Sequence, residues 1–351
     1  MKNILITLNL FIALVLQSCS RDELINPSPD NNTLNGAFVL CEGTFNAGSS
    51  KLSFYNSLTN SITENIFNPG TPGLFPSGMQ LVQKELYMTE QGNFGSDGKI
   101  YLLDTNGTVR KSTTAGINPF SLAVTQSKIY ITNGPSNNVS VLDKNTFNLL
   151  STIPVGIYPQ EILHYNGKIF VCNTRVFGGA TDSTVSVIDV NTDQVIAIIK
   201  VMQTPSSLAI SNEGYLYIGC PGPISSGKIF TVNLTHYTVI DTFTIGNGNA
   251  IGFDKDISVD PQSNYIYFIS YYNNIVQFNT SSETSSVLIP NPNTTENYFY
   301  GYKFDSQNKL HYVTNAKNFQ VSGKLEIYNN SGSLLSSHQT GIAPRRIEIK
   351  N

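Results

Sequence analysis

The chain has 351 residues, a net charge of −3 and only 13% charged residues. Lys and Arg form no cluster larger than the pair Arg345–Arg346, which argues against a nucleic-acid partner. A chain of this length with 40% hydrophobic residues buries a large core without a disulfide scaffold. The composition fits an extracytoplasmic globular domain.

Residues 1–18 have the pattern of a bacterial lipoprotein signal peptide. Lys2 precedes a run over residues 4–16 that is apolar except for Thr7 and Asn9 and is too short to span a bilayer. The run ends in Leu16-Gln17-Ser18-Cys19, which resembles a lipobox, although Gln17 replaces the usual small residue. The resemblance implies cleavage before Cys19 and its triacylation, which anchors the mature protein to the lipid bilayer. The alternative is an ordinary signal peptide with a chance cysteine.

Residues 19–35 are predicted to be the acylated cysteine and a flexible tether, because they are rich in Pro, Asn, Ser and Asp and have little to bury. Ser20 stands where lipoproteins retained in the inner membrane carry aspartate, so the outer membrane is expected. The segment from Ser20 to Glu23 resembles the acidic signal of lipoproteins displayed on the cell surface. Otherwise the protein would face the periplasm.

From residue 36 to 351 the chain repeats a short pattern at intervals of 40 to 49 residues. The pattern Pro-x-x-apolar-x-apolar occurs at five prolines, and two other residues fill the proline slot in the remaining copies: Pro76, Pro119, Pro159, Pro205 and Pro344, with Asp254 and Phe299. A period of this length is typical of propellers and solenoids, in which each unit buries its apolar faces against neighbouring copies.

Each repeat contains four strand patterns, and seven repeats predict an all-β, seven-bladed propeller of four-stranded antiparallel blades. In the fourth repeat the predicted strands are residues 161–165, 168–173, 184–190 and 194–200. The first repeat begins at its second strand, near Gly36, and the missing first strand follows Ile342 at the C-terminus. The C-terminal strand is therefore predicted to close the ring, which removes a free sheet edge.

Several segments are similar to the repeat of YVTN (YncE-like) propellers. The similarity is carried by Gly156–Ile162, Lys168–Asn173 and Val185–Thr192, and by Tyr130–Asn133, which is close to the tetrapeptide that names the family. It extends over residues 36–351 and implies the propeller fold. Because that family includes enzymes, binding modules and surface structural proteins, the resemblance leaves the function open.

The sequence predicts no catalytic or metal-binding residues. No nucleophile elbow, zinc-protease motif or nucleotide fingerprint occurs, and no cofactor is predicted. We expect structural roles for the four histidines: His164, His236, His311 and His338. Six carboxylates fall at one end of the ring, where a calcium-dependent hydrolase would hold its metal, but solvated rim charges are the favoured interpretation. They are Glu42, Glu90, Asp182, Asp254, Asp256 and Glu296.

Cys41, Cys172 and Cys220 are expected to be buried free thiols. Cys172 and Cys220 lie on adjacent blades, but their registers differ by one residue, so they should point to opposite faces.

The strongest functional signal is aromatic. Four of the seven loops that join second to third strands place one Phe among Gly, Asn and Ser, and a fifth carries Tyr271-Tyr272. Rings on short polar loops around a central funnel suit the capture of a flat, partly apolar ligand or a sugar. The alternative is that each Phe folds back over its own blade. The candidate ligand-binding residues are Phe45, Phe94, Tyr158, Phe177, Phe319, Arg175 and Arg345.

Three functions are compatible with the sequence. The favoured one is a membrane-anchored, non-catalytic capture module, because no acid/base pair is evident near the aromatic loops. Tethered propellers of this kind resemble surface capture proteins that sit over TonB-dependent transporters, some of which bind corrinoids. The resemblance implies a corrinoid or glycan ligand and a transporter partner. The alternatives are a lactonase or other hydrolase with a carboxylate-bound metal, and a structural or adhesion propeller.

Overall fold

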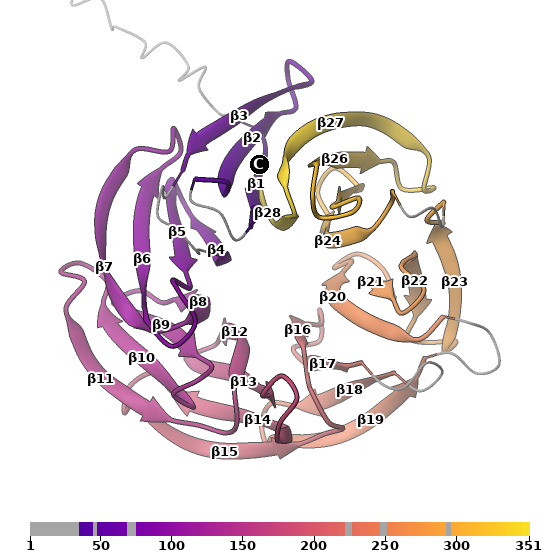
Figure 1. Cartoon of the computed structure of the whole chain (residues 1–351). Helices are drawn as coiled ribbons and strands as arrows, with labels where there is room; N and C mark the ends of the chain where they lie inside the picture. Colours follow the sequence, from indigo (N-terminus) through magenta and orange to yellow (C-terminus); the bar gives the residue numbers. More distant parts are fainter. Residues whose placement is uncertain (1–34, 45–47, 69–74, 222–226, 246–250, 293–295) are drawn as a thin grey trace, which may run out of the picture. The chain divides into compact units, whose positions relative to one another are not determined.

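The computed structural model describes residues 35–44, 48–68, 75–221, 227–245, 251–292 and 296–351. Within these ranges the regular structure consists of seven four-stranded antiparallel sheets arranged in a ring (Figure 1). The predicted seven-bladed propeller is confirmed. No helix in this part of the chain is long and apolar enough to cross a membrane. The predicted signal peptide and Cys19 lie outside the described residues.

The blades are numbered in chain order, and the strands of each blade are given from the innermost to the outermost. The first three blades are blade 1, with β28 (Pro344–Lys350), β1 (Gly36–Cys41), β2 (Lys51–Asn56) and β3 (Ser61–Phe67); blade 2, with β4 (Pro76–Val82), β5 (Glu85–Glu90), β6 (Asp97–Asp104) and β7 (Val109–Ile117); and blade 3, with β8 (Pro119–Val124), β9 (Lys128–Asn133), β10 (Asn138–Asp143) and β11 (Leu149–Pro154).

The other four blades have the same order. They are blade 4, with β12 (Pro159–Tyr165), β13 (Lys168–Arg175), β14 (Thr181–Asp189) and β15 (Gln194–Lys200); blade 5, with β16 (Ser207–Ile210), β17 (Leu216–Cys220), β18 (Lys228–Asn233) and β19 (Thr238–Thr244); blade 6, with β20 (Phe253–Val259), β21 (Tyr265–Ser270), β22 (Ile275–Asn279) and β23 (Thr284–Ile289); and blade 7, with β24 (Phe299–Asp305), β25 (Leu310–Asn315), β26 (Ser322–Tyr328) and β27 (Leu334–Ile342).

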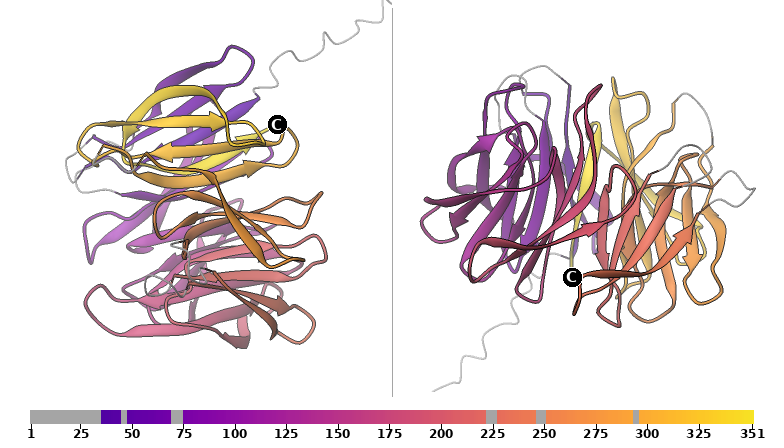
Figure 2. Two further views of the ribbon diagram at one scale, coloured as in Figure 1. Left: turned by 90° about the vertical axis from the view of Figure 1, so that its right-hand side faces the viewer. Right: turned by 90° about the horizontal axis from the view of Figure 1, so that it is seen from below.

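The first strand of every blade lies innermost, so these seven strands surround a central channel that runs along the axis of the ring (Figures 1 and 2). The second strands are covered on both faces by neighbouring blades, as the almost fully buried β9 shows. The outermost strands cover the rim, and most side chains of β11 are exposed. The propeller therefore buries its apolar surface between blades, and polar side chains remain available to line the channel.

The C-terminal strand closes the ring, as predicted. In blade 1, β28 pairs antiparallel with β1, and Val39 lies opposite Ile347. The backbone N–H of Glu42 continues this contact by donating to the carbonyl of Ala343 at 2.9 Å. The last strand of the chain thus covers the inner edge of the first strand in the described structure.

The three described cysteines are buried free thiols, as predicted. Cys172 and Cys220 point to opposite faces of their own sheets, but those two faces pack against each other, so both cysteines belong to one core cluster between blades 4 and 5. The two cysteines thus point to opposite faces, as predicted, and still share one core, because neighbouring propeller blades pack opposite faces against each other. Burial raises the pKa of Cys220 to about 12, so its thiol is held protonated.

Candidate functional site

A cavity of about 500 Å³ occupies the channel, and all seven innermost strands line it. The first strands begin at the end of the ring where the second strands finish, so this end also carries the loops between second and third strands. We call this end the mouth. The residues that follow the repeated proline slot lie here, and in blades 2, 3 and 5 they include small hydroxyl side chains, namely Ser77, Ser121, Ser206 and Ser207. Blades 1, 4 and 6 place charged side chains at these positions, and blade 7 places Tyr300 and Gly301 there.

Arg345 and Asp256 form a buried ion pair at the mouth. Arg345 Nη1 donates to Asp256 Oδ2 at 2.7 Å and Nη2 donates to Oδ1 at 3.0 Å, while the backbone N–H of Tyr302 donates to Oδ2 at 3.1 Å. Both side chains are only 12% exposed. Burial alone would raise the pKa of Asp256, but Arg345 more than offsets it and holds the pKa below its usual value. The bidentate geometry fixes the guanidinium in place.

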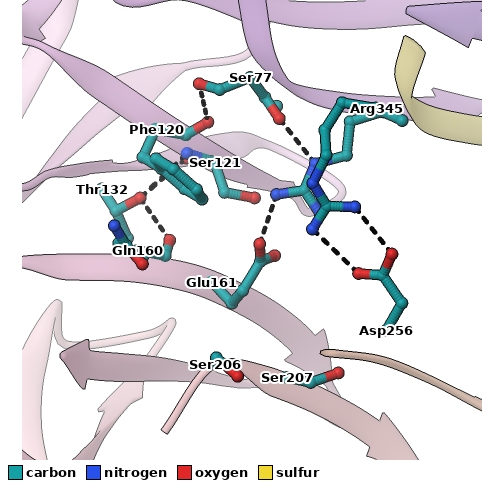
Figure 3. Close-up of polar contacts among 12 residues, drawn as sticks. Ser77, Phe120, Ser121, Thr132, Gln160, Glu161, Ser206, Ser207, Asp256 and Arg345 are labelled. Atoms are coloured by element: carbon teal, nitrogen blue, oxygen red, sulfur yellow. Dashed lines mark hydrogen bonds and ion pairs between the residues drawn. The ribbon is translucent and has the colours of Figure 1, made fainter. Parts of the chain in front are cut away.

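A second set of polar contacts spans the mouth between Ser77 and Glu161, which are labelled in Figure 3, and Arg346 makes both contacts. Its Nε donates to the carbonyl of Ser77 in blade 2 at 2.7 Å, and its Nη2 pairs with Glu161 Oε1 in blade 4. A register shift where β28 pairs with β1 accompanies this arrangement, and such bulges re-aim side chains. Two consecutive arginines of the closing strand therefore connect blade 1 with blades 2, 4 and 6.

Aromatic rings lie next to the two arginines. Arg345 Cζ lies 5.4 Å from the centre of the Tyr300 ring, and Arg346 Cζ lies 5.7 Å from the centre of the Phe120 ring. Lys255 Nζ lies 5.2 Å from the Tyr300 ring. These distances suit cation–π attraction, which is strengthened by partial burial. The mouth combines cations with flat apolar surfaces.

Glu42 also lies at the mouth. The Tyr300 hydroxyl donates to Glu42 Oε2 at 2.7 Å. Burial raises the pKa of Glu42 more than this hydrogen bond and Arg345 lower it. The hydrogen bond from Tyr300 holds the Glu42 carboxyl in place at the mouth.

The predicted aromatic residues have different environments. Phe94 and Phe177 are 84% and 95% exposed, on the mouth-side loops of blades 2 and 4. They do not fold back over their blades. Phe319 does, since it is 39% exposed and its ring centre lies 4.9 Å from that of Tyr300 and 5.3 Å from that of Tyr298. Phe45 lies outside the described residues.

The remaining predicted residues do not converge on one point. Tyr158 is half-buried and packs against Gly134, where an added Cβ would lie 2.9 Å from the ring. Arg175 is exposed at the end of β13. Among the members of the predicted set that the structure describes, Arg345 alone lines the channel. The sequence analysis did not predict the partners Glu161, Arg346 and Tyr300. The available signal was their position one or two residues after the repeated proline slot.

The carboxylates singled out in the sequence are mostly held by protein partners. Glu90 is 2% exposed and accepts a hydrogen bond of 2.6 Å from the Tyr101 hydroxyl, and Asp182 accepts one of 2.8 Å from the Ile157 N–H. Asp254 pairs with Lys255 at 3.1 Å. Glu296 is exposed. The expectation of solvated rim charges is wrong for Glu42, Glu90 and Asp256, because each is removed from solvent and held by a specific partner. Over the described ranges, no group of three or more His, Cys, Asp or Glu residues is placed to hold a metal ion.

The histidines are dispersed. His311 is fully buried, its Nδ1 lies 2.7 Å from the Tyr302 hydroxyl, and burial lowers its pKa to about 4. His338 Nε2 lies 3.1 Å from Asn60 Oδ1 on the outer surface. His164 lines the channel away from the mouth, and burial lowers its pKa. These environments fit structural roles for His311 and His338.

The protein is a seven-bladed β-propeller, and two ion pairs span the mouth of its channel. Residues 35–340 match the family described as a domain of unknown function, DUF5074, and the chain belongs to that family. No curated protein matches the sequence.

Solved structures share the fold at low identity. A quinoprotein alcohol dehydrogenase-like protein from Bacteroides thetaiotaomicron is 15% identical with a TM-score of 0.69, covering 91% of this chain and 79% of the other. A putative 6-phosphogluconolactonase from Bacteroides fragilis is 14% identical with a TM-score of 0.67, covering 92% and 100%. A protein of unknown function from Desulfotomaculum acetoxidans is 14% identical with a TM-score of 0.64, covering 90% and 98%. At these identities the similarity shows the fold alone.

Proposed function

We propose that this propeller is a non-catalytic capture module that binds a flat, partly apolar ligand at its mouth. The observation that carries the proposal is the exposure of Phe94 and Phe177 on loops beside a mouth lined by arginines and aromatic rings. Burying a large aromatic side chain is worth about 1.5–3 kcal/mol, so rings held in water on polar loops provide binding energy when a ligand covers them.

The polar groups of the mouth support binding more than turnover. Asp256 and Glu161 are each paired with an arginine, which neutralises both carboxylates as candidate bases. A fixed guanidinium still offers hydrogen-bond donors and a planar face to a ligand. The ligand would lie over the ion pairs and contact the exposed rings at its edges. Corrinoids and glycans have the required combination of broad apolar surface and peripheral polar groups.

Replacing Phe94 and Phe177 together by Ala should weaken ligand binding by at least about tenfold, because each lost ring contact costs about 0.5–1.5 kcal/mol beyond its buried area. The melting temperature should stay unchanged, since both rings are exposed. The measurement is calorimetry against corrinoids, oligosaccharides and lactones, with and without calcium. The single variant Phe319→Ala is the matched control, and it should lower the melting temperature because Phe319 packs on Tyr298 and Tyr300. Unchanged affinity of the double variant would refute the aromatic site.

We also propose that the protein is anchored at the cell surface. With Cys19 acylated and residues 20–35 as a tether, the propeller would reach a ligand outside the outer membrane and pass it to a transporter beside it. Cys19→Ala should move the protein from the membrane fraction to the soluble fraction and abolish labelling by radioactive palmitate. Membrane fractionation and labelling that persist in this variant would contradict the anchor.

A further inference from the structure

A second cavity, of about 470 Å³, lies between blades 4 and 5 at the end of the ring opposite the mouth. The turn between β12 and β13 contributes Tyr165, the turn between β16 and β17 contributes Glu213 and Tyr215, and the hairpin between β18 and β19 contributes Tyr237. Three tyrosines from three separate turns therefore line one cleft. We call it the tyrosine cleft.

The equivalent place between blades 3 and 4 is bridged by side chains. The Tyr130 hydroxyl donates to Asp193 Oδ1 at 2.6 Å, and Lys128 Nζ donates to Asp193 Oδ2 at 2.7 Å. Lys128 also donates to the carbonyl of Val190 at 3.0 Å. Tyr130 and Lys128 belong to β9 of blade 3, whereas Asp193 and Val190 lie in the outer hairpin of blade 4. These bonds connect the two blades.

Blades 4 and 5 replace each part of that bridge. Phe170 occupies the position of Tyr130 and has no hydroxyl, and Tyr237 occupies the position of Asp193 with the same backbone φ of 54°. Lys168 occupies the position of Lys128 but donates to Asp189 of its own blade at 2.9 Å. The tyrosine cleft is thus open because this copy of the repeat has exchanged its bridging groups for aromatic ones.

The walls of the cleft are held in place before any ligand arrives. Asn166 and Gly167 form the two-residue turn after Tyr165, with φ of 47° and 73°, the combination that suits a tight hairpin. The N–H of Tyr215 donates to Ser211 Oγ at 3.1 Å, and Asn233 Oδ1 accepts from the Thr235 N–H at 2.8 Å. A preformed site saves the ordering cost of binding.

The chemistry of the lining selects the ligand class. Lys168 is neutralised by Asp189, so the charge of Glu213 leaves the cleft slightly negative and disfavours an anion. Tyrosine rings offer apolar faces for the C–H side of a sugar, while Asn233, Glu213 and the tyrosine hydroxyls offer partners for its hydroxyl groups. We propose that the tyrosine cleft binds a neutral mono- or disaccharide. This site is independent of the mouth.

Calorimetry with glucose, galactose, N-acetylglucosamine and maltose tests the proposal on the whole protein. At least one of these sugars should bind with a dissociation constant on the order of 1 mM or tighter. Tyr237→Ala should weaken that binding at least about tenfold. The double variant Phe170→Tyr with Tyr237→Asp rebuilds the bridge seen between blades 3 and 4, and it should abolish binding while the protein stays folded.

A variant on the opposite end separates the two sites. Phe94→Ala with Phe177→Ala should leave sugar binding at the tyrosine cleft unchanged, whatever its effect at the mouth. The proposal is overturned if none of the four sugars binds, or if the bridge-rebuilding variant folds and binds as the parent does.

Discussion

Deleting Arg345–Asn351 should lower the melting temperature by about 10 °C or more. The deletion removes most of β28, exposes the inner edge of β1 and leaves Asp256 and Glu161 without their arginines. Buried side chains such as Ile347 are worth about 1.5–3 kcal/mol each, and a loss of 1 kcal/mol shifts the melting temperature of a chain this large by about 2 °C. Thermal unfolding followed by circular dichroism measures the effect.

Deletion of Asn351 alone is the matched control. Its side chain contacts Asp305 at 3.3 Å but it lies beyond the end of β28, so the melting temperature should change little. If the longer deletion also melts within a degree or two of the parent, the C-terminal strand does not hold the ring closed.

Asp256→Ala should have the second-largest effect, because it leaves the guanidinium of Arg345 buried without its carboxylate. Breaking a buried ion pair in this way costs about 3–5 kcal/mol of unfolding free energy. Replacing both partners, with Arg345→Met and Asp256→Leu, should recover most of the loss, since apolar side chains carry no desolvation penalty. Denaturant unfolding of the parent, Arg345→Met, Asp256→Leu and the double variant gives the coupling energy. A coupling near zero would contradict the pair.

The same pair predicts a pH dependence. The pKa of Asp256 is lowered in the folded protein, so its stabilising contribution is fully present above the unfolded pKa of about 3.9 and is lost as the pH falls through the lower folded value. The stability difference between the parent and Asp256→Ala should be constant from about pH 5 to pH 8 and shrink below about pH 4. A difference that grows on acidification would contradict this assignment.

The sequence predicts the ring well because propeller blades repeat one local pattern. The proline slot marks each innermost strand, and the incomplete first repeat requires a strand from the C-terminus, which β28 supplies. The same repeat predicts which loops share the mouth. It does not show which rings stay in water, because the packing of Phe319 on Tyr298 and Tyr300 depends on neighbouring loop geometry.

The ion pairs could not be predicted from the sequence for a different reason. Arg346 and Glu161 are 185 residues apart and meet only because the ring places blades 1 and 4 across the channel. The tyrosine cleft could be predicted from the sequence in part. Aligning the repeats reveals the exchange of Tyr130 for Phe170 and Asp193 for Tyr237, but the pairing of Lys168 with Asp189 decides that the space stays open.

Native mass spectrometry of the protein incubated with corrinoids, oligosaccharides and lactones tests the capture function most directly, because it reports both binding and the chemical integrity of the ligand. We expect a one-to-one complex whose mass is that of the protein plus the intact ligand, and we expect this complex to be lost in the Phe94→Ala, Phe177→Ala variant. Absence of any complex, or a lactone released one water molecule heavier, would contradict non-catalytic capture at the mouth.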